Sequence, residues 1–137
     1  MVDKKTVQCT DEISNTLKLL KANGTVVEVR ILNTNKGTIS GYYDDLKKLA
    51  DDVEPYNGKY NIYFTINPVK QELLARSKNR LQEYAHITTS DADIDKRSIL
   101  MIDFDAKRSA GISSSDDEHA KAIEKAEQVK DFLTEQS

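Results

Sequence analysis

Hydrophobic positions along this chain follow two spacings, one typical of helices and one typical of strands. Apolar residues recur every three or four positions in 11–22, 44–53 and 70–85 and again after 113–115, which predicts four helices. Residues 25–32, 38–43, 60–66 and 98–105 are rich in β-branched, aromatic or alternating apolar residues, and they predict four strands. The first ten residues are expected to be disordered. Because helices and strands follow one another without a strict parallel repeat, we predict an α+β fold, a small mixed or antiparallel sheet with helices packed on one face.

Capping and turn residues mark several element ends. Asp44 or Asp45 can cap the short second helix, and Ser115 with Glu118 has the spacing of a capping box at the start of the last one. The composition of residues 33–37 predicts a hairpin loop. In the predicted helix over 70–85, the helical spacing places these residues inward: Leu73, Leu74, Ser77, Leu81 and Tyr84.

The predicted strand over 98–105 ends in two carboxylates separated by one residue. Because alternate side chains of a strand share a face, Asp103 and Asp105 are expected to point the same way, about 6–7 Å apart, with Leu100, Ile102 and Phe104 facing a core. Two like charges on one face repel each other, and Mg²⁺ or Mn²⁺ between them relieves this repulsion. On spacing alone, a solvated strand end is the commoner interpretation of Asp-x-Asp.

The composition fits one soluble domain over residues 1–137. The chain has 38% hydrophobic and 31% charged residues and a net charge of −3, so binding to nucleic acid would need a local basic surface. Cys9 is the only cysteine, which excludes an internal disulfide and a thiolate zinc cluster. Because no signal peptide and no apolar run of about 18–20 residues is visible, we expect a cytoplasmic protein without membrane contact.

Several segments in order resemble the amino-terminal part of the archaeo-eukaryotic primase superfamily, specifically the primase-polymerases of phages, plasmids and other mobile elements. The segments are 26–32, 37–45, 63–69, 73–76, 79–81, 88–94 and 100–105, together with 110–113 and 116–119. Residues 100–105 match the first catalytic motif of that family, a hydrophobic strand that carries Asp-x-Asp. The similarity covers roughly residues 24–125, although Ala106 stands where the family usually has proline.

This resemblance implies a DNA primase or polymerase, that is, a metal-dependent nucleotidyltransferase of DNA replication in a mobile element. It implies that Asp103 and Asp105 are catalytic metal ligands for Mg²⁺ or Mn²⁺, with a DNA template and nucleoside triphosphates as partners and, commonly in this family, a helicase. The histidine motif and the further aspartate motif of the family are absent from this sequence, and His119 lies in the wrong context to replace the histidine. We therefore expect the amino-terminal part of a larger catalytic domain, with little activity alone.

Six further residues are candidates for contacts with nucleic acid or nucleotide. Lys107 and Arg108 follow the aspartates and are placed to reach phosphate oxygens. The alternative, that both are solvated cations of a loop, has equal weight. The other four candidates are Arg76, Asn79, Arg80 and Arg97. For these four, a solvated polar surface is the commoner interpretation.

Other interpretations stay open at this point. A non-catalytic module of primase-like fold that binds nucleic acid or protein is the main alternative, and a different phosphotransfer enzyme such as a nuclease is the third. Asp91 and Asp93 form another Asp-x-Asp, which we predict to serve turn and capping roles. Tyrosines on strands, such as Tyr42 and Tyr63, offer stacking surface for bases, although packing is the commoner role.

Overall fold

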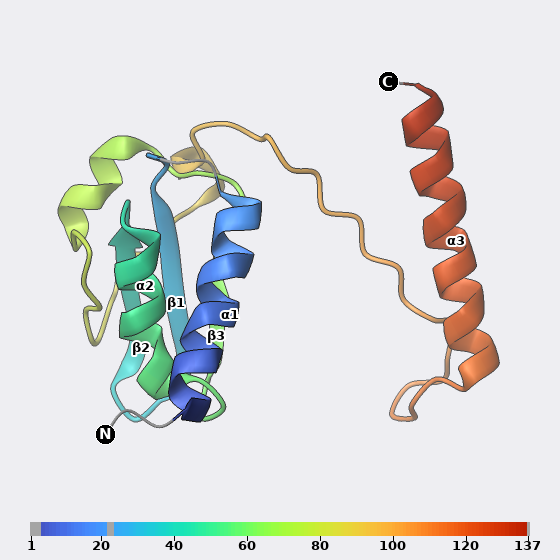
Figure 1. Cartoon of the computed structure of the whole chain (residues 1–137), viewed down its shortest axis with the longest axis horizontal. Coiled ribbons are helices and arrows are strands. Elements are labelled where there is room, and N and C mark those ends of the chain that lie inside the picture. Colours follow the sequence, from blue (N-terminus) through green and yellow to red (C-terminus); the bar gives the residue numbers. More distant parts are fainter. Residues whose placement is uncertain (1–3, 22–23, 137) are drawn as a thin grey trace. The chain divides into compact units, whose positions relative to one another are not determined.

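The computed structural model describes residues 4–21 and 24–136. The chain divides into two compact units, residues 1–99 and residues 100–137, and each is described by itself (Figure 1). The assignment of residues 1–137 to a single domain stays a prediction.

The centre of the first unit is a three-stranded antiparallel sheet. Its strands are β1 (Val27–Thr34), β2 (Gly37–Tyr43) and β3 (Asn61–Phe64), in the spatial order β2-β1-β3. Val29 of β1 lies opposite Gly41 on one side and Phe64 on the other. The hairpin between β1 and β2 follows the prediction, with Asn33 and Gly37 in the left-handed conformation that such loops favour. The predicted α+β class with an antiparallel sheet is confirmed.

Two helices cover one face of this sheet, α1 (Lys4–Leu20) and α2 (Leu46–Val53), as Figure 1 shows. The predicted cap of α2 is confirmed, because the Asp45 carboxylate accepts a 2.9 Å hydrogen bond from the backbone N–H of Lys48. A short 3₁₀ turn, η1 (Glu54–Tyr56), follows α2. The helices and the sheet bury one apolar cluster: Leu17, Val27, Val29, Tyr43, Leu49 and Val53.

The start of α1 differs from the prediction. The helix begins at Lys4 and not at Asp11, so residues 4–10, predicted to be disordered, belong to it. No glycine or proline interrupts residues 4–20, and a helix can therefore extend beyond the turns that its apolar stripe anchors. Residues 1–3 lie outside the described residues.

The opposite face of the sheet is partly covered by irregular segments and two short 3₁₀ helices, η2 (Gln71–Arg76) and η3 (Asp91–Asp93). Apolar side chains from η2 and from Val69 pack against Tyr42 of β2 and against Val26, which precedes β1. The second buried cluster consists of Val26, Tyr42, Val69, Leu73 and Leu74. Ser90 and Asp93 form a capping box at η3, which confirms the predicted capping role of Asp93.

The predicted helix over 70–85 is wrong beyond Arg76. From Ser77 to Ala85 the backbone runs along the outer edge of β2, where Ser40 and Gln82 exchange two hydrogen bonds and Ala85 donates to Thr38. This pairing satisfies backbone groups that an edge strand would otherwise leave open, and it outweighs the helical propensity of the segment. Leu73, Leu74 and Ser77 are buried as predicted, whereas Tyr84 is exposed.

The second unit carries helix α3 (Asp116–Glu135), which begins with the predicted capping box of Ser115 and Glu118. The strand predicted over 98–105 is absent, since these described residues form neither helix nor strand. Leu100 and Ile102, which were predicted to face a core, are 79% and 44% exposed. A strand is stable only with a neighbouring strand, and the described part of the chain provides no ladder partner for this segment.

Candidate functional site

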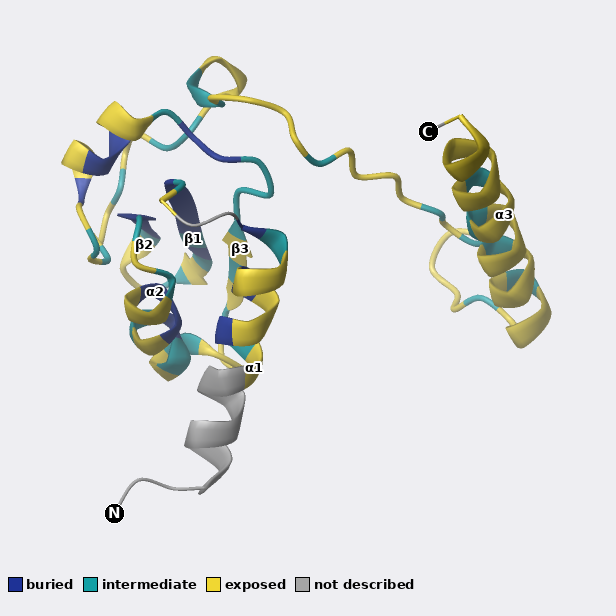
Figure 2. Ribbon diagram, turned by 45° about the horizontal axis from the view of Figure 1, so that its top comes forward, coloured by how far each residue is buried: buried dark blue, intermediate teal, exposed yellow. Residues whose placement is uncertain are grey.

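The two aspartates of the proposed metal motif lie in the irregular segment of the second unit. Asp103 and Asp105 are both exposed, and Figure 2 shows most of the segment around them in the exposed colour. Their carboxylate oxygens are the donor type that Mg²⁺ and Mn²⁺ prefer, so the donor chemistry fits these ions. Among the described residues, however, no group of three or more His, Cys, Asp or Glu side chains is placed to hold a metal. The pair therefore offers two protein ligands, and other oxygen donors would have to complete the coordination.

Lys107 and Arg108 are exposed in the same segment. The Arg108 guanidinium donates a 3.4 Å hydrogen bond to the backbone carbonyl of Ile112, which holds this side chain against its own loop. Their predicted contact with phosphate stays a prediction.

Arg76 is the candidate residue with the most defined surroundings. It ends η2, and its Nη1 donates a 3.0 Å hydrogen bond to the Tyr42 hydroxyl. The guanidinium carbon lies 5.7 Å from the centre of the Tyr42 ring, within cation–π range, and Nη2 lies 4.0 Å from the Asp93 carboxylate. The hydrogen bond to Tyr42 raises the pKa of Arg76, so this fixed side chain stays charged.

Asn79 holds the fold together at the corner between β2 and α2. Its side-chain oxygen accepts hydrogen bonds from the backbone N–H groups of Asp44 and Asp45, both at 3.2 Å, and its Nδ2 donates a 2.6 Å bond to the Asp44 carboxylate. The residue has φ of +49°, a left-handed conformation that asparagine tolerates better than most residues. The structure thus gives Asn79 a structural role, and its predicted contact with nucleic acid stays a prediction.

Arg80 and Arg97 are both exposed. The backbone carbonyl of Arg80 lies against Gly41, where an added Cβ would approach its oxygen to 2.5 Å. The sequence placed Arg76, Asn79 and Arg80 on one helix face, but the structure places only Arg76 on the 3₁₀ helix and the other two in the segment along β2.

A buried charge that the sequence did not indicate lies on the same face of the sheet as Tyr42. Glu28 has no exposed surface, and its carboxylate accepts hydrogen bonds from Arg30 at 2.7 and 2.9 Å, from Ser40 at 2.6 Å and from the Thr89 backbone N–H at 3.0 Å. Arg30 Nη2 also donates to the Thr89 carbonyl. The alternation of Val27, Glu28 and Val29 predicts that Glu28 faces away from the helices, but not that the loop at Thr89 covers it.

These hydrogen bonds decide the charge state of Glu28. Burial alone would raise the pKa of its carboxyl, but the donors from Arg30, Ser40 and Thr89 together hold the pKa below its usual range. Glu28 is therefore ionised at neutral pH and fixes the loop at Thr89 to the sheet.

A cavity of about 320 Å³ opens between β2, Arg76 and residues 82–87. Its floor contains the nearly buried side chains of Ser40, Tyr42 and Ser77. Gln82, Ala85, His86 and Ile87 complete its walls. Of these residues the sequence singled out Arg76 as a candidate for nucleic-acid contact. The pairing of residues 77–85 with β2, which forms the other wall, is not visible in the local sequence pattern.

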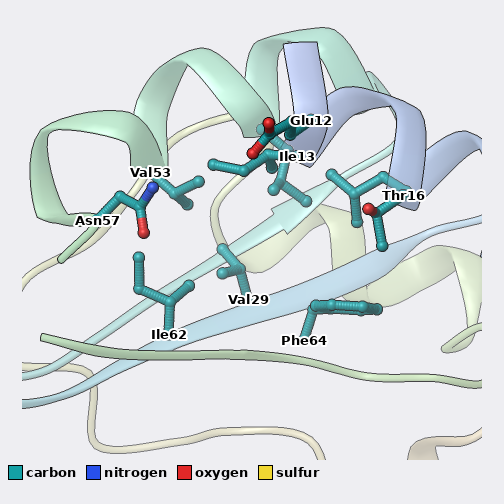
Figure 3. Close-up of a pocket in the computed structure, with 10 residues that line it drawn as sticks. Glu12, Ile13, Thr16, Val29, Val53, Asn57, Ile62 and Phe64 are labelled. Atoms are coloured by element: carbon teal, nitrogen blue, oxygen red, sulfur yellow. The ribbon is translucent and has the colours of Figure 1, made fainter. Parts of the chain in front are cut away.

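A second cavity, of about 280 Å³, lies on the helix-covered face of the sheet (Figure 3). Most of its lining is apolar, and it includes Ile13, Val29, Val53, Ile62 and Phe64 from α1, α2 and the strands. Imperfect packing between helices and sheet accounts for such a cavity without a ligand.

Comparisons with protein-family models, with curated proteins and with solved structures each gave no match to this chain. In the described part of the chain, no helix is long and apolar enough to cross a membrane.

Proposed function

We propose that this chain is the part of a mobile-element primase-polymerase that carries the first metal motif, and that residues 1–99 correspond to the amino-terminal portion of that catalytic fold. The observation that carries this proposal is the order of the resembling segments along the chain, which ends in the Asp-x-Asp of residues 103–105. A single Asp-x-Asp is weak evidence, whereas several segments in the family's order are much stronger.

The packing of the first unit supports this proposal. Glu28 from the first resembling segment bonds to Ser40 from the second and to Thr89 from a later one, and Arg76 bonds to Tyr42. Segments that resemble one family in sequence thus depend on one another for their structure. This is expected if they were inherited as one folding unit.

In this proposal Asp103 and Asp105 hold Mg²⁺ or Mn²⁺. An ion held there would supply positive charge to neutralise a nucleoside triphosphate and to activate a primer hydroxyl. Lys107 and Arg108, which follow Asp105 after one intervening residue, would donate hydrogen bonds to phosphate oxygens. Because only two protein carboxylates are available, we expect stable metal binding only when phosphate oxygens of a nucleotide complete the coordination.

Primer synthesis and extension with Mn²⁺, all nucleotides and a DNA template test this proposal. The assay compares this chain with a longer form that includes its downstream coding sequence, if the reading frame continues. Each of these proteins is also tested with the double substitution Asp103→Ala and Asp105→Ala. We expect little or no activity from the chain by itself and clear activity from the extended form. An extended form that is active and keeps its activity without both aspartates would show that the metal assignment is wrong.

A module that binds nucleic acid without catalysis is the second candidate function. Two observations favour this second candidate. Asp103 and Asp105 are exposed, and among the described residues no third acidic ligand lies beside them. Binding of single-stranded DNA that is unchanged by chelation of metal, together with no activity in any extended form, would support this candidate over the first.

A further inference from the structure

We propose that the cavity beside Arg76 binds one unstacked nucleobase of a single-stranded nucleic acid. The inference rests on the proposed function only for the choice of nucleic acid as the partner. The cavity residues themselves are independent of Asp103 and Asp105, which belong to the other unit.

The size and lining of the cavity fit a base better than a free anion. Its volume of about 320 Å³ lies at the lower end of the roughly 300–1,000 Å³ typical of small-molecule sites. Among the described residues that line it, Arg76 alone carries a permanent charge, and Asp93, 4.0 Å from this guanidinium, partly balances that charge. A phosphate dianion would therefore find too little positive charge inside the cavity.

Planar groups and hydrogen-bonding groups are both present in the walls. Arg76 and His86 are flat side chains of the kind on which unpaired bases stack, and the Gln82 amide can both donate and accept at a base edge. Ala85 and Ile87 add apolar surface. This mixture of flat, apolar and bidentate polar groups is typical of base recognition in single strands.

The cavity is also held in shape before any ligand binds. Arg76 is fixed by its hydrogen bond to Tyr42, and the Thr89 hydroxyl donates a 3.4 Å bond to the same Tyr42 oxygen. Backbone pairing of Gln82 with Ser40 fixes the opposite wall. A rigid cavity loses little conformational entropy when a base enters it.

Cations are available for the phosphates on either side of the inserted base. Lys78 and Arg80 are exposed and lie between the lining residues Ser77 and Gln82 in the chain. Contacts of this kind are independent of sequence, so we expect modest discrimination among bases and a strong dependence on salt.

Fluorescence anisotropy with labelled single-stranded DNA of about 12 nucleotides tests this inference. The measurement is made in EDTA, so that failure of the metal proposal does not affect it. The test variants are His86→Ala and Gln82→Ala, whose side chains are exposed and whose loss leaves the backbone pairing intact. The matched controls are His119→Ala on α3 and Lys18→Gln on α1.

We expect each test variant to raise the Kd for the oligonucleotide about fivefold or more, as loss of one base contact does, while both controls bind like the unaltered chain. Duplex DNA of the same sequence and inorganic phosphate should compete poorly. Lack of binding by the unaltered chain, equal Kd values for all variants, or full competition by inorganic phosphate would each overturn the inference. Thermal melting of each variant establishes that it is folded.

Discussion

The Ser40 hydroxyl donates a 2.6 Å hydrogen bond to the carboxylate of Glu28, a side chain with no exposed surface. This bond connects β2 to β1 on the face of the sheet that the helices do not cover. Arg30 and Thr89 supply the remaining donors, so the buried charge is paired and fully hydrogen-bonded. A buried charge of this kind stabilises a fold only while all its partners are present.

Removal of Glu28 should therefore destabilise the protein strongly. We expect Glu28→Ala to lower the free energy of unfolding by about 3 kcal/mol, because it leaves Arg30 partly buried without its partner. Urea denaturation followed by circular dichroism measures this change. The control is Glu72→Ala on η2, an exposed position where we expect a change within about 0.5 kcal/mol. Equal effects of the two substitutions would contradict the role of Glu28.

The stability of the first unit should fall in acid because of the same residue. The folded-state pKa of Glu28 lies below its ordinary value of 4.5, so the unfolded chain takes up this proton first as the pH falls. The contribution of Glu28 is present above the unfolded-state pKa and is lost as the pH falls through the folded-state pKa. Unfolding free energies at about pH 6 and about pH 3.5 should therefore differ less in Glu28→Gln than in the unaltered chain. The same difference in both proteins would show that Glu28 does not contribute.

Gly41 should not tolerate any side chain. A Cβ at this position would lie 2.5 Å from the Arg80 carbonyl oxygen and 2.7 Å from the Tyr43 ring. We expect Gly41→Ala to lower the free energy of unfolding by about 1–3 kcal/mol, since the segment along β2 would have to move. Gly24→Ala is the control, because Gly24 has φ of +78° but no atom lies within 4 Å of an added Cβ. For this control we expect the free energy of unfolding to fall by about 1 kcal/mol, through backbone strain alone. A smaller effect at Gly41 than at Gly24 would argue against the close packing of residues 77–85 on β2.

The apolar cavity in Figure 3 should accept one more methylene group. Val53 lines it, so Val53→Ile adds apolar surface where space exists, and we expect a gain of about 0.8 kcal/mol in unfolding free energy. Val27 is equally buried but does not line the cavity, and Val27→Ile should cost about 1 kcal/mol through overpacking. Thermal and urea unfolding of both variants measure the contrast. A loss at Val53 would mean that the cavity is not available in solution.

Local signals in the sequence predicted local structure well. Asp44 or Asp45, and Ser115, were predicted as helix caps from the residues within one turn, and the caps observed are Asp45 and Ser115. The β-branched and alternating residues of 25–32 predicted a strand, and β1 (Val27–Thr34) lies over most of this range. These features depend on neighbours in the chain, which a single sequence displays directly.

Features that depend on distant partners were predicted poorly. Residues 77–85 have helical spacing, but pairing with the edge of β2 determines their conformation. Residues 98–105 have the composition of a strand, but a strand needs a neighbouring strand, and the residues that the structure describes supply none for this segment. The burial of Glu28 depends on Thr89, about sixty residues away, and nothing near Glu28 in the sequence indicates this contact.

Binding of Mn²⁺, followed by electron paramagnetic resonance, tests the central claim most directly. The chain is titrated with Mn²⁺ in the presence and absence of a nucleoside triphosphate, and the variant Asp103→Asn with Asp105→Asn is compared with the control Asp91→Asn with Asp93→Asn. We predict that, in the presence of nucleotide, the unaltered chain binds more Mn²⁺ than the nucleotide binds by itself. The variant at Asp103 and Asp105 should lose this additional Mn²⁺ binding, whereas the control variant should keep it. Equal retention by both variants would contradict the assignment of residues 103 and 105 as the metal ligands.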